Sequence, residues 1–338
     1  MGFRIRALQR EEIDGFLCCF QASFGVDGQS LAIIRNSLVN DPSFHPQRVR
    51  LGVLDGQIIS HVVVLHRAAW VGNQAVTVAG ITAVATHPYY QGRGFGTRVM
   101  RDALHLVRKR GYGLAMLTTQ VPGFFVRLGF TGVPAAIGYQ CPASALARLE
   151  TVAEYQVERL DYNADWPTLG AIYREYSDGR TGMQLRDVRF WESWPRRGTF
   201  PHGFSSSLDA IGLLARREGR VAAYLAAHGG ADPATLTVTD FAHCDEEPEA
   251  LLPLLQNAAN LWRTAGGRRV VIHSGGEAPV LRLLEAQGVP LELDIGQGLM
   301  ALIVHQQWIK AAGFRDQQDA LQGLFPSGRP LMWHRDGY

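Results

Sequence analysis

The sequence predicts a mixed α/β protein made of two tandem modules, each a twisted mixed central sheet flanked by helices. In the first half, alternating apolar runs typical of strands are followed by an amphipathic helical pattern. The second half repeats this order of elements. Gly111 and Gly267, which each close a predicted helix, are separated by nearly the same spacing as Gly129 and Gly288. A constant offset between similar elements indicates a duplicated module.

The elements of the first module follow from hydrophobic period and turn residues. Asp-Gly and Gly-Asn pairs between alternating runs predict hairpin turns. An apolar stripe opposite a charged face predicts a long helix that ends at Gly111. The expected order is a strand at 3–8, helices at 11–24 and 30–39, strands at 49–54, 58–66 and 74–86, the long helix, a strand at 114–117, a helix at 122–128 and an extended segment at 133–140.

The second module is expected to begin near residues 145–155. Its predicted elements are strands at 211–216, 221–227 and 235–241, a helix at 248–265, a strand at 270–273, a helix at 278–286 and a last strand at 299–304. The domain prediction is therefore 1–148, 149–305 and a C-terminal tail at 306–338. The tail contains a helical stretch at 308–321 and an apolar end, so we expect it to pack on the body.

Composition narrows the class of protein. A chain of 338 residues with 46% hydrophobic and 19% charged residues is typical of a globular protein. The net charge of +2 excludes the basic footprint of a nucleic-acid-binding protein. The N-terminus has no apolar signal-peptide core, and no stretch approaches the roughly 18 apolar residues that a membrane span requires. We therefore expect a cytoplasmic protein without a nucleic-acid or membrane partner; an oligomer is compatible with the sequence.

The cysteines and histidines have no metal-ligand spacing. The four cysteines form no CxxC pair and lie near no histidine at a suitable interval. Adjacent Cys18 and Cys19 fall in an apolar helical stretch, which favours buried thiols in a reducing compartment. The sequence predicts no metal site.

One segment, residues 81–98, has the pattern of a phosphate-binding turn. An apolar strand leads through a proline turn to Gly92, Gly94 and Gly96, and a helix begins at once. Because glycine has no Cβ, the backbone N–H groups can converge on an anion. The N-terminus of the helix adds unpaired donors and the positive end of its dipole. The pattern indicates a site for a pyrophosphate.

The spacing excludes two common nucleotide motifs. The glycines follow GxGxG rather than the GxGxxG of dinucleotide-binding folds, and no acidic residue ends a strand about 20 residues further on. The Walker A pattern requires a Gly-Lys pair, which the sequence does not contain. A glycine-rich turn with a purely structural role is the alternative interpretation.

Two motifs resemble those of one enzyme family. Gln91-Gly-Arg-Gly-Phe-Gly96 resembles the Q/R-x-x-G-x-G/A signature of the GCN5-related N-acetyltransferases, and Phe124-Phe-Val-Arg-Leu-Gly-Phe130 resembles that family's F-Y-x-R-x-G-F segment. The resemblance covers residues 3–140, and from Cys141 onward only the order of elements matches. The duplicated layout is similar to tandem members, including aminoglycoside acetyltransferases of the enhanced-intracellular-survival type.

The resemblance implies a reaction and a set of binding residues. The reaction is transfer of an acetyl group from acetyl-CoA to a primary amine on a small molecule or peptide. A bulge at the end of the strand at 74–86 would splay it from the next strand, and the thioester would lie in the gap. The residues implied to bind the coenzyme, mostly through their backbones, are Val84, Ala85, Gln91, Gly92, Arg93, Gly94, Phe95, Gly96 and Thr97.

The sequence departs from the family at the catalytic positions. Many members protonate the leaving thiolate with a tyrosine, where this chain has Phe125, and many carry a glutamate base on the strand that here, at 74–86, has no carboxylate. The catalytic residues therefore stay unknown. His66 and His87 are candidate bases, although packing or surface roles are the alternative. The C-terminal carboxylate of Tyr338 is a third candidate, by resemblance to the enhanced-intracellular-survival type.

The second module departs further. In place of the glycine turn it has Cys244-Asp-Glu-Glu-Pro-Glu249, whose acidic side chains would cap the following helix and repel a phosphate. We expect this module to bind no coenzyme and either to wall the acceptor pocket or to serve a structural role. Two other functions stay open for the whole chain. It could be a non-catalytic acyl-CoA-binding or sensing protein, which Phe125 favours, or a purely structural tandem module.

Overall fold

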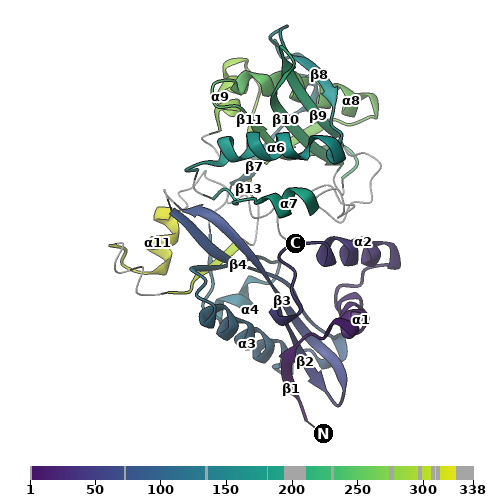
Figure 1. Ribbon diagram of the computed structural model, residues 1–338, viewed down its shortest axis with the longest axis vertical. Coiled ribbons are helices and arrows are strands. Elements are labelled where there is room, and N and C mark those ends of the chain that lie inside the picture. Colours follow the sequence, from purple (N-terminus) through teal and green to yellow (C-terminus); the bar gives the residue numbers. More distant parts are fainter. Residues whose placement is uncertain are drawn as a thin grey trace.

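The computed structural model describes residues 2–71, 74–133, 136–180, 182–193, 211–229, 232–273, 278–295, 299–305, 309 and 313–324. These residues form two bodies, each built on a seven-stranded mixed sheet flanked by helices. The N-terminal body is the lower one in Figure 1, and the second body stands above it. The predicted fold class, two tandem mixed α/β modules, is confirmed. In the described residues, no helix is both long and apolar enough to cross a membrane.

The first sheet separates two helical layers. Alternate residues of β3 (Gln57–Val71) enter different cores, because successive side chains of a strand point to opposite faces. Val63 and Leu65 pack with Phe16 of helix α1, whereas Val62 and Val64 pack with the long helix α3. The strand order is β1 (Arg4–Ala7), β2 (Val49–Leu54), β3, β4 (Gln74–Thr86), β5 (Leu114–Thr118), β14 (Leu299–Ile303) and β6 (Thr131–Gly132); the helices are α1 (Ile13–Phe24), α2 (Gly28–Val39), α3 (Phe95–Lys109), α4 (Pro122–Val126) and α11 (Gln317–Leu324).

The second sheet repeats this arrangement around the largest core. Its central strand β11 pairs antiparallel with β10 and parallel with β12, as β4 pairs with β3 and β5 in the first sheet. The strand order is β13 (Glu292–Ile295), β7 (Ala136–Pro142), β12 (Arg269–Ile272), β11 (Thr235–His243), β10 (Arg220–Gly229), β9 (Ile211–Arg217) and β8 (Gln156–Arg159); the helices are α5 (Ala143–Leu146), α6 (Tyr162–Ser177), α7 (Val188–Ser193), α8 (Leu251–Thr264) and α9 (Pro279–Ala286). Strands β8 and β13 and helices α6 and α7 are not among the elements predicted from the sequence.

The two sheets exchange strands. The sequence order suggests that the extended segment at 133–140 completes the first module and that the strand at 299–304 completes the second. In the structure, β7 lies between β12 and β13 of the second sheet, and β14 lies between β5 and β6 of the first. Gly138 fits β7 to its neighbour, because a Cβ there would lie 2.5 Å from the Ile272 carbonyl oxygen. Each sheet therefore contains strands from both predicted domains, 1–148 and 149–305. These domain ranges stay a prediction.

A short segment of the second body pairs with the end of β3. The Trp70 N–H donates to the Met183 carbonyl at 3.0 Å, and the Leu185 N–H donates to the Ala68 carbonyl at 2.8 Å. The Trp70 side chain packs against the core of the second body. The junction thus combines backbone hydrogen bonds with apolar contact, which fixes the long β3–β4 hairpin against the second body (Figure 1).

The C-terminal prediction falls only partly on described residues. The structure has helix α11 at Gln317–Leu324, and its Ala320 and Leu321 pack under β14 in the first body. The expected helical stretch at 308–321 is therefore described only at residues 309 and 313–321, of which 309 and 317–321 are helical. The apolar end at 331–338, including Tyr338, lies outside the described residues.

Candidate functional site

Strands β4 and β5 pair over only part of their length. The ladder joins Val78 to Leu114, Ala79 to Ala115 and Gly80 to Met116. Beyond Gly80, β4 continues to Thr86 and β5 to Thr118, with no further ladder pair between these described strands. The sheet therefore opens at the ends of two neighbouring parallel strands. Such an opening exposes backbone groups that an extended ligand can use.

A β-bulge on β4 lies beside this opening. The register between β3 and β4 shifts between the pairs His61–Ala85 and Val63–Thr82, so that Ala83 and Val84 together oppose Val62. The bulge implied by the resemblance is therefore present. Ala83 has a φ of 48°, a left-handed conformation that a residue with a Cβ rarely adopts. Bulges of this kind re-aim the chain next to active sites.

Two side chains of β3, the neighbour of β4 opposite to β5, contact the bulge. The Nδ1 atom of His61 lies 2.6 Å from the Ala83 carbonyl oxygen, and the Ser60 hydroxyl donates to the Ala85 carbonyl at 2.8 Å. His61 is completely buried, and its ring packs edge-on against Phe16 and stacks on Phe20. Burial lowers the pKa of His61 from 6.5 to about 4. His61 is not among the residues predicted for the site, because nothing in an apolar strand shows which residue faces a bulge.

The glycine turn and the start of α3 follow β4 directly. Gly92 and Gly94 have positive φ values of 75° and 78°, and Gly94 is the N-cap residue of α3. The first hydrogen bond of the helix runs from the Arg98 N–H to the Gly94 carbonyl. The preceding N–H groups of the helix have no partner within it, which is the donor arrangement that binds an anion. The turn is exposed to solvent from Gln91 to Gly94, and Phe95, Gly96 and Thr97 are half-buried.

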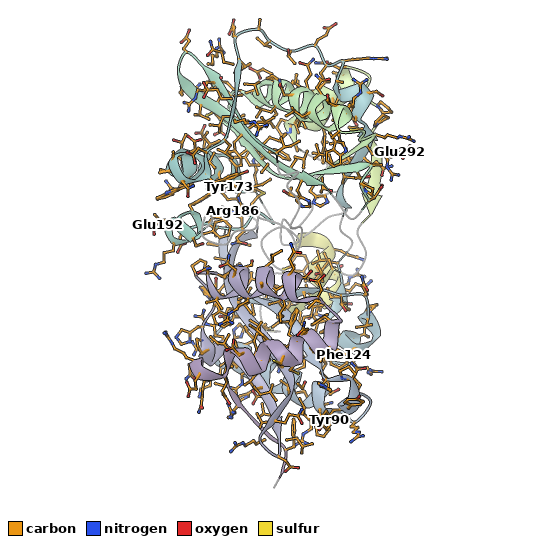
Figure 2. All side chains as sticks on the ribbon, turned by 90° about the vertical axis from the view of Figure 1, so that its right-hand side faces the viewer. Tyr90, Phe124, Tyr173, Arg186, Glu192 and Glu292 are labelled. Atoms are coloured by element: carbon orange, nitrogen blue, oxygen red, sulfur yellow. The ribbon has the colours of Figure 1, made fainter. Side chains whose placement is uncertain are left out.

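The turn is anchored to the end of β4. The Gln91 side-chain amide donates to the Thr86 carbonyl at 3.0 Å. A Cβ at Gly96 would lie 2.8 Å from the Thr86 hydroxyl oxygen, so only glycine allows this close approach. The guanidinium of Arg93 lies 5.8 Å from the centre of the Tyr90 ring, which positions a positive charge at the turn. Figure 2 shows Tyr90 near the bottom of the first body, with Phe124 above it.

The other sequence candidates occupy structural positions. His87 caps the short helix at Pro88–Tyr90 by accepting from the Tyr89 N–H, and its ring contacts those of Tyr89 and Tyr90. The His66 Nδ1 lies 3.3 Å from the Tyr112 hydroxyl, and burial, with Arg48 and Arg67, lowers its pKa. His66 pairs with Ala79 of β4, and Ala79 in turn pairs with Ala115 of β5. His66 therefore lies beside the part of β4 that is still paired with β5, before the opening begins.

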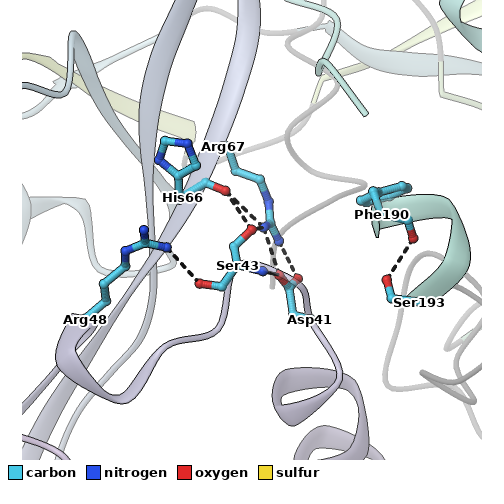
Figure 3. A network of polar contacts seen from close by, with 7 residues as sticks. All are labelled: Asp41, Ser43, Arg48, His66, Arg67, Phe190 and Ser193. Carbon is cyan, nitrogen blue, oxygen red and sulfur yellow. Dashed lines mark hydrogen bonds and ion pairs between the residues drawn. The ribbon is translucent and has the colours of Figure 1, made fainter. Parts of the chain in front are cut away.

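Figure 3 shows the polar network beside His66. Arg67 forms a buried ion pair with Asp41, with Nη2 and Oδ2 2.6 Å apart, and the Ser43 hydroxyl donates to the His66 carbonyl at 2.7 Å. Arg48 donates to the Ser43 carbonyl at 3.2 Å. These contacts tie the loop after α2 to β3. They give the residues around His66 a structural role.

Phe125 belongs to the aromatic core under α3. It is 4% exposed, and its ring packs edge-on against Phe124 and Phe130. It shares this core with Ile81 of β4 and Leu117 of β5, the strands that separate at the opening. The ring therefore belongs to the same core as the two strands that separate at the opening. Tyr338, the remaining catalytic candidate, lies outside the described residues.

The second body has a bulge at the equivalent place but a different turn. The register of β10 and β11 shifts between the pairs Ala226–Asp240 and Ala227–Val238. Before α8, the Tyr155 hydroxyl lies 3.1 Å from both Glu247 and Glu249, and Arg220 forms an ion pair with Glu247. The acidic side chains are thus held at the start of this helix by the body's own residues.

In the described part of the chain, no three His, Cys, Asp or Glu side chains are placed to hold a metal ion.

Comparison with known proteins agrees with this geometry. Residues 4–133 match the acetyltransferase (GNAT) domain family. An uncharacterised N-acetyltransferase of Streptomyces coelicolor is 32% identical over 118 residues, which are 34% of this chain and 28% of that protein. The match therefore spans less than a third of that relative's length.

Solved structures share the fold of both bodies. A GCN5-related N-acetyltransferase from Anabaena variabilis superposes with a TM-score of 0.69 at 16% identity, over 90% of this chain and 73% of that one. Eis1 from Mycobacterium abscessus superposes with a TM-score of 0.62 at 18% identity, over 89% of this chain and 73% of that one. At these identities the superposition shows a common fold.

The splayed strands, the bulge and the glycine turn before α3 all lie within the residues that match this family. Residues 4–133 form a domain of the GCN5-related N-acetyltransferase family. The chain as a whole shares the fold of these solved structures, with a second, similar sheet following the first.

Proposed function

We propose that this chain transfers an acetyl group from acetyl-CoA to a primary amine of a small molecule or peptide, within the cytoplasm. One observation carries the proposal: the opening between β4 and β5 leads directly to a glycine turn and a helix start with unpaired N–H groups. A ligand with an extended arm and a pyrophosphate fits these two features together. Coenzyme A has both.

Each part of the coenzyme has a candidate partner. The backbone of Val84 and Ala85 would bind the pantetheine arm beside the bulge. The pyrophosphate would lie on the turn and helix start, where the donors precede the first helical hydrogen bond. The residues proposed for this second contact are Gln91, Gly92, Arg93, Gly94, Phe95, Gly96 and Thr97.

The reaction would be a direct displacement. The neutral amine nitrogen attacks the thioester carbon, the carbon–sulfur bond breaks and coenzyme A leaves as the thiolate. The amine proton passes to water or to a base. Phe125 has no proton to give, and β4 has no carboxylate, so holding the reactants in contact would supply most of the rate acceleration.

Two glycines at opposite ends of α3 provide a matched test of binding. Gly94 and Gly111 have similar positive φ values of 78° and 73°, and at each a Cβ would meet nothing within 4 Å. Valine at either position is strained by the same backbone conformation. Only Gly94→Val should abolish acetyl-CoA binding measured by calorimetry, because only Gly94 precedes the unpaired donors. Equal affinities in the two variants would refute the site.

The absence of the family's catalytic residues favours a second candidate function, a non-catalytic acyl-CoA-binding or sensing protein. A turnover assay against a panel of primary amines, corrected for acetyl-CoA hydrolysis, separates the two. Product formation with any amine supports the transferase. Tight binding without turnover supports the sensor. In the same assay, deletion of Gly337 and Tyr338 should lower turnover at unchanged acetyl-CoA affinity if the C-terminal carboxylate is the base.

A further inference from the structure

His61 makes one polar contact at the bulge of β4. Its Nδ1 lies 2.6 Å from the Ala83 carbonyl oxygen, which can only accept a hydrogen bond. The proton of the neutral ring is therefore on Nδ1, and Nε2 has no hydrogen-bond partner among the described residues. Because the ring has no exposed surface and a pKa of about 4, it stays neutral at physiological pH. The contact is thus a hydrogen bond from the Nδ1–H of a neutral ring to the Ala83 carbonyl.

The contact holds a residue with an unusual backbone conformation. Ala83 has a φ of 48°, where its Cβ is crowded by the backbone. A residue in that region keeps its conformation only when its surroundings impose it. The Ala83 carbonyl is held by His61, and the Ala85 carbonyl is held by the Ser60 hydroxyl at 2.8 Å. The carbonyls on either side of Val84, those of Ala83 and Ala85, are therefore each hydrogen-bonded to a side chain of β3, and this fixes the backbone of Val84 between them.

His61 is unsuited to act on the acceptor itself. Phe16 and Phe20 of α1 pack on its ring, with centroid distances of 4.6 Å and 6.0 Å. A ring whose pKa is about 4 takes a proton from an alkylammonium group only weakly. Any effect on acetyl transfer must therefore pass through Ala83 and the strand that carries it.

We propose that His61 is a positioning residue of the acyl-transfer site, which holds the β4 bulge in the shape that presents Val84 to the coenzyme. The inference rests on the proposed function, since it assumes that the pantetheine arm lies along β4. It also assigns a role to a buried histidine that would otherwise be only part of the core.

The test replaces the ring by one of similar shape without a donor. His61→Phe keeps the packing against Phe16 and Phe20 but leaves the Ala83 carbonyl without its bond. We expect the Kd for acetyl-CoA, measured by calorimetry on the full chain, to rise about tenfold or more. Val63→Ala is the matched control: it lies on the same strand and face, is 1% exposed and leaves a cavity in the same core. It should be destabilised with an unchanged Kd.

A second substitution distinguishes positioning from simple loss of stability. Glycine adopts a positive φ without strain. Ala83→Gly in the His61→Phe background should therefore restore acetyl-CoA affinity to within about threefold of the wild type, because a relaxed bulge needs less support. Unchanged affinity in His61→Phe, or an affinity that falls equally in Val63→Ala, would overturn the proposal.

A measurement without coenzyme separates this proposal from the proposed function. Nitrogen-15 NMR of the wild type identifies which ring nitrogen of His61 carries the proton. Protonation at Nδ1 supports the bond to Ala83, and protonation at Nε2 overturns it. If the wild type binds no acetyl-CoA, the proposed function fails, while the NMR result and the protection of the Val84 amide from hydrogen exchange still test the bond.

Discussion

The guanidinium of Arg186 lies 2.7 Å from the carboxylate of Asp240, and neither side chain has any exposed surface. Asp240 forms the first ladder pair beyond the bulge of β11, as Ala85 does beyond the bulge of β4. The second body thus carries a buried carboxylate where the first has a small apolar residue. Tyr224 donates to the same carboxylate at 3.3 Å, and Figure 2 shows Arg186 beside Tyr173. The buried pair therefore lies next to the bulge, at the register position that Ala85 occupies in the first body.

Breaking this pair should destabilise the protein strongly. Arg186→Met removes the positive charge of a buried ion pair, which costs about 3–5 kcal/mol of unfolding free energy. Arg35→Met is the control, because Arg35 and Asp14 form an ion pair with both side chains more than half exposed. Such surface pairs contribute at most about 1 kcal/mol. Urea denaturation of both variants measures the difference, and similar losses would contradict the structural role of the buried pair.

The unfolding free energy should also depend on His61 at acid pH. Its pKa is lower in the folded state, about 4, than the ordinary value of 6.5, so the unfolded chain binds more protons between these values. The contribution is therefore fully present above pH 6.5 and is lost as the pH falls towards 4. A shift of this size corresponds to about 3 kcal/mol.

The His61→Phe variant isolates this contribution. His66 and His243 also have lowered pKa values and contribute in the same direction, but they are common to both proteins. The stability advantage of the wild type over His61→Phe should therefore shrink by about 3 kcal/mol between pH 7 and pH 4 in urea titrations. A pH-independent difference would show that His61 is not buried as a neutral ring.

Local patterns predicted much of this fold, and long-range contacts account for what they missed. The turn at the Asp-Gly pair Asp55-Gly56 was predicted from residue type, and both residues have the positive φ values that such hairpin turns require. The helix ends at Gly111 and Gly288 were predicted in the same way. These features depend on a few neighbouring residues.

The exchange of β7 and β14 could not be predicted in this way. Both strands are short and apolar, and each pairs antiparallel with its neighbours, so nothing in their own sequences selects one sheet over the other. The choice depends on contacts more than a hundred residues apart, such as Gly138 against Ile272. The role of His61 was missed for the same reason, since Ala83 is its partner only after β3 and β4 have paired with a bulge.

One acetyl-CoA should bind per chain. The turn before α8 holds Glu247 and Glu249 next to the Tyr155 hydroxyl, and their charge would repel a pyrophosphate. Calorimetry of the wild type should give a stoichiometry of one. In Gly94→Val, binding should disappear altogether, because no second site remains. If the wild type instead binds two acetyl-CoA molecules and Gly94→Val still binds one, the second body binds the coenzyme as well.

Restoring the family's tyrosine should speed up the proposed reaction. Phe125→Tyr adds one hydroxyl to a ring in the core between α3 and the separating strands, where it could protonate the departing thiolate. We expect a higher turnover number with unchanged acetyl-CoA affinity, and a stability loss of about 1–3 kcal/mol if the hydroxyl finds no partner without coenzyme.

Phe130→Tyr is the matched control, since its ring is 2% exposed and lies 5.9 Å from that of Phe125. It adds the same group at the last position of the motif instead of at the tyrosine position, and it should not raise turnover. If Phe125→Tyr folds, binds acetyl-CoA and turns over no faster than the wild type, protonation of the thiolate at this position does not limit the rate.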